Sequence, residues 1–254
     1  MRILHDPVVL MYHGFAEAAP DHDPFSLVVT RERLAQQLGV LGRGEHVAVD
    51  LDGYLDAVAR PRRPRRMLVT IDDGYQSVAD IAAPMLAAAG VPALLFVPPG
   101  RVGTTSAWMD EFADEAIMDA GTLARMPAFG IEIGCHGWDH AVMVGMSDAE
   151  LRRNTVEARE ALADLTGTPP RTFAYPEGRF DQRALDAVRR AGFEVAFSVH
   201  DDAGRFAISR VDVNATDNAA TFRLKLFPGY RRLWRLADRA SVLRRTVRRV
   251  AQHI

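Results

Sequence analysis

The chain has 254 residues and a formal net charge of −2, and 48% of its residues are hydrophobic. That composition is typical of a globular protein, and the length suits one large α/β domain. No run of eighteen apolar residues occurs, so we expect no transmembrane helix. One cysteine, Cys135, excludes an internal disulfide framework, and the N-terminus shows no signal-peptide pattern. Together these features predict a cytoplasmic protein.

Short apolar runs alternate with helical patterns along most of the chain. Because strand–helix–strand order favours parallel pairing, we predict a single α/β domain over residues 1–222, a distorted (β/α) barrel of about seven strand–helix units. A helical tail is expected over residues 223–254, and a loop over residues 14–29. The expected strands cover residues 8–12, 46–49, 67–71, 93–97, 130–134, 172–175, 194–199 and 206–211. The expected helices cover residues 30–41, 51–58, 78–89, 108–118, 147–165 and 181–190.

Polar residues stand directly after several of these strands, where parallel α/β folds place their ligand sites. The buried strand 67–71 ends in Asp72 and Asp73, whose like charges would repel unless a positive charge lies near them. A second pair, His136 and His140, is spaced to hold one ion if the segment is helical. Taken alone, the Asp pair is also common in plain turns, and a His pair at this spacing is common on surfaces or in cores. One Asp and two His together form an oxygen–nitrogen–nitrogen set with open positions, as in catalytic zinc sites, and the second Asp can then act as a base.

Three motifs in this order resemble those of the polysaccharide deacetylases, carbohydrate esterases of the chitooligosaccharide-deacetylase type. Thr70-Ile-Asp-Asp-Gly74 resembles their T-F-D-D-G motif, and His136-Gly-Trp-Asp-His140 resembles H-S/T-x-x-H. Phe173-Ala-Tyr-Pro-Glu-Gly178 resembles the F-A-Y-P-Y-G version of the third motif. The N-terminal Met11-Tyr-His-Gly14 resembles the Y-H segment of members whose motif order is permuted. The resemblance runs from about residue 8 to residue 213, which is most of the chain.

The resemblance implies a hydrolase that removes an N-acetyl group from an amino sugar by attack of metal-bound water. Asp73, His136 and His140 would bind one divalent ion, which we expect to be zinc, and Asp72 would be the general base. A backbone N–H in the Tyr175-Pro-Glu-Gly turn, that of Glu177, would help to stabilise the oxyanion.

A general acid must protonate the departing amine, and the sequence offers two candidates. In members with the usual motif order the acid is a late histidine, and here His200 follows a predicted strand. In permuted members it comes from the N-terminal segment. We favour His13, because its strand-end position fits independently and because residues 201–204 read as a polar turn that would expose His200.

The chain departs from the family pattern at several positions. Gly137 stands where Ser or Thr is usual, and Glu177 stands where Tyr is usual. The Arg of the common third motif is absent, and we expect Arg210 to pair with Asp72 instead and to lower the pKa of its carboxyl. Cys135 is expected to be a core residue, because strand alternation points it away from His136. Three aromatic residues are expected either to contact the sugar or to pack in the core: Trp108, Trp138 and Tyr175.

The C-terminal tail carries a different pattern from the acidic body. Ten Lys or Arg residues and one Asp fall between residues 223 and 254, against 21 basic and 32 acidic residues in the rest. From Tyr230 onward, apolar residues recur at threes and fours among arginines, which predicts a basic amphipathic helix. Such a helix packs on the barrel or on another subunit, or binds the anionic inner face of the membrane. Nucleic acid is not an expected partner, because the body is acidic and lacks a recognition motif.

We therefore expect a metal-dependent N-deacetylase whose partner is an acetylated amino-sugar substrate. The carrier of that sugar stays open among a glycan, a lipid-linked or nucleotide-linked precursor and a small glycoside, and so does the oligomeric state. One alternative is a metal-dependent amidohydrolase that acts on a non-sugar amide. Another is a catalytically weak, membrane-associated carbohydrate-binding module, against which the intact Asp72 argues because sugar binding needs no base.

Overall fold

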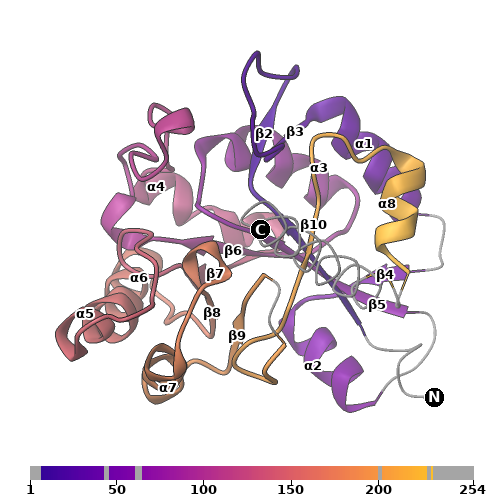
Figure 1. Ribbon diagram of the computed structural model, residues 1–254. Coiled ribbons are helices and arrows are strands. Elements are labelled where there is room, and N and C mark those ends of the chain that lie inside the picture. Colours follow the sequence, from indigo (N-terminus) through magenta and orange to yellow (C-terminus); the bar gives the residue numbers. More distant parts are fainter. Residues whose placement is uncertain (1–6, 43–45, 61–64, 200–201, 228–229, 231–254) are drawn as a thin grey trace, which may run out of the picture.

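The computed structural model describes residues 7–42, 46–60, 65–199, 202–227 and 230. Its main sheet is parallel and has the strand order β10-β1-β5-β6-β7-β8-β9, with β4 paired to β5. The curled sheet surrounded by helices is the predicted distorted α/β barrel (Figure 1). The strands of this sheet are β1 (Val8–Tyr12), β4 (His46–Ala48), β5 (Arg65–Ile71), β6 (Ala93–Val97), β7 (Ile131–Cys135), β8 (Thr172–Ala174), β9 (Val195–Phe197) and β10 (Val211–Asp212).

The helices begin at side-chain caps that the sequence supplies. Thr30, Asp50 and Asp181 each accept a hydrogen bond from a backbone N–H in the first turn of the helix that follows. Ser147 and Glu150 form a reciprocal capping box. Two helices contain a wider, π-helical stretch, at Val78–Ala82 before α3 and at Arg153–Glu157 between α5 and α6. The α-helices are α1 (Arg31–Leu41), α2 (Leu51–Ala59), α3 (Ala83–Ala88), α4 (Ala120–Leu123), α5 (Asp148–Arg152), α6 (Ala158–Thr166), α7 (Gln182–Arg190) and α8 (Ala219–Lys225).

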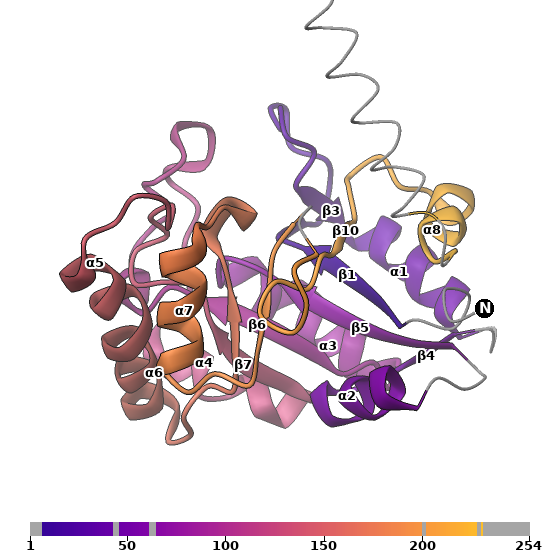
Figure 2. The same cartoon turned by 60° about the horizontal axis from the view of Figure 1, so that its bottom comes forward.

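Side-chain alternation along β5 places Asp72 in the interior of the barrel. Leu68 packs in a cluster with residues of β1, β6, β8 and β9, and Leu51 and Tyr54 of α2 belong to the same cluster. Helix α2 lies next to β5 (Figure 2). Every second residue of β5, beginning at Met67, instead joins the larger cluster that packs against the helices. Thr70 and Asp72 therefore point the same way as Leu68, because the side-chain period of a strand is two.

One short segment, residues 208–213, bonds to both ends of the curled sheet. Ile208 exchanges backbone hydrogen bonds with Ala196 and Ser198 of the β9 side. Farther along, β10 pairs with β1, and the Val213 N–H donates to the Met11 carbonyl. The segment thus crosses from β9 to β1, which completes the ring and brings Arg210 into the interior. A strand was expected over residues 206–211, but the crossing leaves only Val211–Asp212 as a strand.

The helix expected over residues 108–118 is wrong. Only one 3-10 turn forms there, Asp110–Phe112, and backbone bridges join Tyr75 to Ile117 and Thr105 to Ala116. A helix would have placed two pairs of like charges four residues apart, Asp110 with Asp114 and Glu111 with Glu115, and such pairs destabilise a helix. The expected loop over residues 14–29 is also partly wrong. It contains β2 (Gly14–Ala16) and most of β3 (Val28–Thr30), which pair in parallel.

The C-terminal tail beyond Tyr230 lies outside the described residues, so its amphipathic helix and its membrane contact stay predictions. The division of the chain at residue 222 also stays a prediction, as does the cytoplasmic location. Within the described ranges, no helix combines the length and the apolar character that crossing a bilayer would require.

Gly134, in the strand that leads to the histidine motif, faces the ring of Phe96 inside the barrel. A Cβ atom at residue 134 would lie 2.5 Å from the Phe96 ring and 2.6 Å from the Thr172 hydroxyl. We expect Gly134→Ala to lower the free energy of unfolding by about 1–3 kcal/mol, because such overpacking forces neighbours to shift. Urea denaturation measures this change. Gly39→Ala is the control: it lies in α1 with open space around it and should stabilise by about 0.5–1 kcal/mol. Equal stability of the two variants would contradict the close packing at Gly134.

Candidate metal centre

Asp72 is held in the barrel by a two-pronged ion pair with Arg210. The Arg210 Nη1 and Nη2 atoms donate to the two carboxylate oxygens at 2.6 and 2.7 Å, and the Asp72 backbone N–H donates to the Tyr12 carbonyl. Arg210 also donates to the Thr70 hydroxyl and to the Ser198 carbonyl, so four of the five N–H groups of this buried guanidinium have acceptors. Burial, the largest single cause, would raise the pKa of the Asp72 carboxyl, but the charge and hydrogen bonds of Arg210, together with the charges of His136 and His13, lower it.

Asp73, His136 and His140 converge on one point at the same end of the sheet. The Asp73 Oδ1 atom lies 3.5 Å from His136 Nε2 and 3.2 Å from His140 Nε2. One ligand atom from each of the three lies within 4.8 Å of the others. Burial opposes ionisation of the Asp73 carboxyl, but the two imidazoles hold its pKa well below the usual range. The three side chains therefore form a cluster that attracts and can grip a cation.

Two observations show that this cluster fits a divalent ion. The His136 Nδ1 atom lies 2.7 Å from the Ala174 carbonyl oxygen, which only accepts, so Nδ1 carries a proton and, in the neutral imidazole, Nε2 keeps its lone pair for a metal. The Asp73 Oδ1 atom is buried and has no hydrogen-bond partner among the described residues. One carboxylate oxygen and two imidazole nitrogens leave further positions open, as in a catalytic site. One divalent metal is consistent with this set.

Two of the ligands have a strained backbone, and the loop between the two histidines is closely packed. Asp73 (φ 73°) and His140 (φ 68°) adopt the left-handed conformation, which costs a non-glycine residue about 1–2 kcal/mol. Gly137 is left-handed too, at φ 72°, and a Cβ there would lie 3.0 Å from Asn154 Oδ1. That Asn154 oxygen accepts from the Trp138 backbone N–H at 2.9 Å, and its Nδ2 donates to the Glu150 carbonyl. Buried Asn154 thus anchors the loop between the two histidines, where the family usually has a hydroxyl at residue 137.

His13 lies close enough to the two carboxylates for its charge to lower the pKa of both Asp72 and Asp73. It follows β1 directly, and β1 pairs with β5 in register, Tyr12 opposite Ile71. His200, the other candidate acid, lies outside the described residues.

The third motif forms a tight turn, Pro176–Gly178, in which Glu177 is left-handed at φ 54°. The Glu177 side chain is exposed and pairs weakly with Arg179 at 3.4 Å. Tyr175 is fully buried, and its hydroxyl donates to the Phe206 carbonyl, so the structure gives this ring a packing role. Trp138 packs against Gly100. The Cζ atom of the Arg153 guanidinium lies over the Trp138 ring, 5.0 Å from the ring centre. Cys135 is buried and is not part of the metal cluster.

Trp108, whose place the sequence pattern left open, and two residues that were not predicted, Tyr75 and Asn154, lie at or near the metal cluster. The Trp108 ring stacks on His140 at a centroid distance of 4.7 Å and lies 6.5 Å from the Tyr75 ring. Burial, together with the nearby Asp73 charge, raises the pKa of Tyr75. The signal for Tyr75 was available, because it stands two residues after Asp73. The signal for Asn154 was a polar residue in the middle of an amphipathic helix.

Asp73→Ala should abolish stoichiometric metal binding, because two histidines alone are a poor ligand set and the only carboxylate of the cluster is lost. Elemental analysis of purified protein after incubation with zinc measures this. Cys135→Ala is the control and should retain about one equivalent, since the cysteine packs beside the cluster without joining it. Equal metal content in the two variants would show that the ion binds elsewhere.

Asn154→Leu should weaken metal affinity about tenfold to a hundredfold, the usual effect of removing a group that orients a ligand. Competition with a chelator of known affinity measures the change. Asn154→Asp keeps the acceptor for the Trp138 N–H and should lie between wild type and Asn154→Leu. If Asn154→Leu lost stability but bound metal as tightly as wild type, the residue would serve packing alone.

Comparison with known proteins agrees with this geometry. The family model described as polysaccharide deacetylase matches residues 59–196. A curated protein of Bacillus subtilis (strain 168), named "Putative polysaccharide deacetylase YxkH", is 22% identical over 161 residues, which are 61% of this chain and 54% of that protein. The chain therefore spans about half the length of this relative.

Solved structures show a similar fold. Streptococcus pyogenes deacetylase PplD, in complex with acetate, aligns with a TM-score of 0.74 and 16% identity over 87% of this chain and 97% of that one. IcaB from Ammonifex degensii aligns with a TM-score of 0.72 and 24% identity over the same shares of the two chains. Whether the motif order is permuted stays a prediction. Since the family match extends over more than half of the chain, from the end of α2 into β9, the protein belongs to the polysaccharide deacetylase family.

Proposed function

We propose that the protein removes an N-acetyl group from an amino sugar by metal-dependent hydrolysis. The observation that carries the proposal is a buried, ionised Asp72, held by Arg210 beside an open cluster of Asp73, His136 and His140. We propose zinc as the ion, because an oxygen–nitrogen–nitrogen set with open positions suits it. When bound, such an ion acts as a Lewis acid that polarises a carbonyl and makes water a stronger acid.

In this proposal Asp72 takes a proton from the attacking water. A general base must be ionised and must keep a free lone pair near the reacting atoms. The Arg210 pair satisfies the first need by stabilising the carboxylate inside the barrel. It satisfies the second because two hydrogen bonds use only half of the four lone-pair sites of a carboxylate. The Asp72 Oδ2 atom also lies 3.9 Å from His136 Nε2, so the base faces the metal cluster.

His13 is our proposed general acid for the departing amine. It approaches the two carboxylates from β1, whereas both histidine ligands come from the loop after β7. A donor on a separate strand can reach the leaving group without displacing a ligand. His200 remains the alternative acid.

We further propose that the Glu177 backbone N–H stabilises the oxyanion. The left-handed turn at Glu177 follows β8, whose last residue, Ala174, accepts from His136. The short distance along the chain from the His136 contact to the turn supports this proposal, and a backbone donor needs no particular side chain at residue 177.

Asp72→Asn and His13→Ala should each lower kcat about 10²- to 10⁴-fold and retain metal, because each removes a proton-transfer group without removing a ligand. Acetate release from N-acetylglucosamine oligosaccharides measures the rate, and elemental analysis measures the metal. Asp80→Asn, an exposed carboxylate on the helix that follows, is the control and should keep full activity.

Two outcomes would redirect the proposal. Metal loss in Asp72→Asn would make Asp72 a ligand rather than a base. Acetate release from non-sugar amides, without any from the oligosaccharides, would favour the amidohydrolase alternative.

A further inference from the structure

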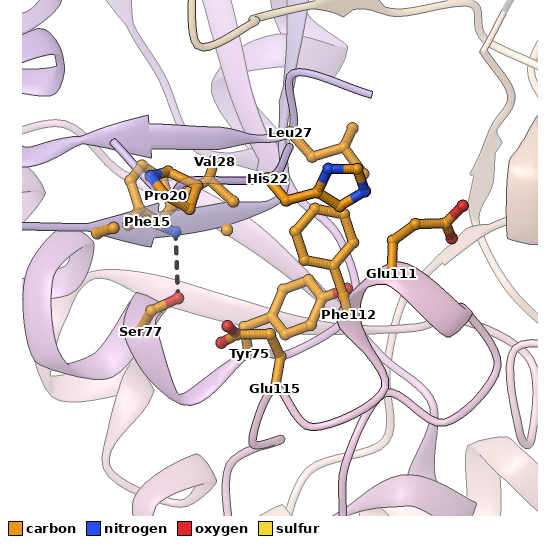
Figure 3. Close-up of a pocket in the computed structure, with 12 residues that line it drawn as sticks. Phe15, Pro20, His22, Leu27, Val28, Tyr75, Ser77, Glu111, Phe112 and Glu115 are labelled. Carbon is orange, nitrogen blue, oxygen red and sulfur yellow. Dashed lines mark hydrogen bonds between the residues drawn. The ribbon is translucent and has the colours of Figure 1, made fainter. Parts of the chain in front are cut away.

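A pocket of about 220 Å³ lies beside the metal cluster, between the loop that joins β2 to β3 and the acidic segment 105–117 (Figure 3). Its walls are largely apolar and aromatic, with Phe15, Leu27, Tyr75 and Phe112 among them. In this view the side chains of Glu111 and Glu115 lie on opposite sides of the Phe112 ring. The size suits a single sugar-sized ring rather than a long stretch of polymer.

The pocket is a neighbour of the metal cluster and shares residues with its surroundings. Gly14 lines the pocket and directly follows His13. Tyr75 lines it too, and it is close enough to Asp73 for that carboxylate to raise the pKa of the phenol. The Trp108 ring lies 6.5 Å from the Tyr75 ring and stacks on His140. A sugar unit in this pocket would therefore adjoin a second unit held at the metal cluster.

The formally charged residues in the pocket lining, Glu111 and Glu115, are both acidic, and His22 is the one lining residue that can gain a positive charge. Glu111 and Glu115 form no ion pair with any residue in the described part of the chain, and the pocket lining includes no Lys or Arg. Five carboxylates and no Lys or Arg fall between residues 102 and 124. Such a surface attracts cations and repels phosphate groups. It therefore disfavours a sugar that is carried on a diphosphate, whether lipid or nucleotide.

We propose that this pocket binds an amino-sugar unit with a free amine, next to the acetylated unit that reacts. The apolar face of the sugar ring packs on Phe112 and Tyr75, and the ammonium group pairs with Glu111 or Glu115, which lie on either side of the Phe112 ring. This inference rests on the proposed deacetylation and names its substrate class, a partly deacetylated oligosaccharide. Because deacetylation leaves an amine, each turnover on a glycan creates the group that the pocket accepts.

The experiment compares two substrates, a fully acetylated oligosaccharide of N-acetylglucosamine and the same oligosaccharide with one neighbouring free amine. Wild type should favour the second in kcat/KM, and E111Q/E115Q should reduce that preference about threefold to tenfold, the range expected for one or two exposed ion pairs. D110N/D114N is the matched control: it removes the same charge from the same segment, but Asp110 and Asp114 do not line the pocket. Its preference should stay within about twofold of wild type.

Equal loss of preference in the two double variants would overturn the pocket assignment, since a long-range field would then explain it. No preference in wild type would overturn it as well. If neither oligosaccharide released acetate, the proposed function would be wrong. A binding measurement would then test separately whether the pocket accepts an amino sugar. Glucosamine oligosaccharide, titrated into the metal-loaded protein by calorimetry, should then bind wild type and D110N/D114N but not E111Q/E115Q.

Discussion

Two consecutive buried carboxylates, Asp72 and Asp73, are the constraint on which the rest of the structure depends. Like charges this close cannot both stay ionised in a buried site unless each meets positive charge of its own. The chain gives them different partners, the Arg210 guanidinium for the first and, for the second, two imidazoles that together with it can hold a cation. Strand alternation and the left-handed backbone at Asp73 send the two side chains toward these separate partners. The parts of the barrel near the site position these partners beside the two carboxylates.

Arg210 arrives through the irregular closure of the barrel. A regular last strand would pair with β9 and β1 along its whole length, whereas residues 208–213 bond first to one and then to the other. That crossing turns the guanidinium inward over the Phe96 ring, 5.6 Å from its centre. A buried ion pair adds little net stability, but removing one partner from such a pair costs about 3–5 kcal/mol. The pair therefore ties the ionisation of Asp72 to the closure of the sheet.

The parts of the site that local patterns encode could be predicted from the sequence. An apolar strand that ends in two carboxylates, and two histidines after another strand, suffice to place Asp73, His136 and His140 at one end of a parallel sheet. The segment 108–118 could not be placed in this way, because its backbone bonds to residues after Asp73 rather than to itself. The like charges four residues apart in this segment, Asp110 with Asp114 and Glu111 with Glu115, already argued against a helix. Asn154 was equally hidden, since its role depends on a loop 16 residues away in the chain.

The range of the family match separates the proposed metal ligands from two other residues of the site. Residues 59–196 contain the three clustered ligands, Asp72 and the Glu177 turn, whereas His13 and Arg210 lie outside that range. Both of these outer residues depend on β1: His13 follows it directly, and the strand after Arg210 pairs with it at Leu10 and Met11. Metal binding thus rests on β5 and β7, whereas the proposed acid His13 and the Arg210 partner of the proposed base Asp72 depend on β1 and β10. A disturbance of the β1–β10 pairing should reach proton transfer before it reaches the metal, because no ligand is carried on either strand.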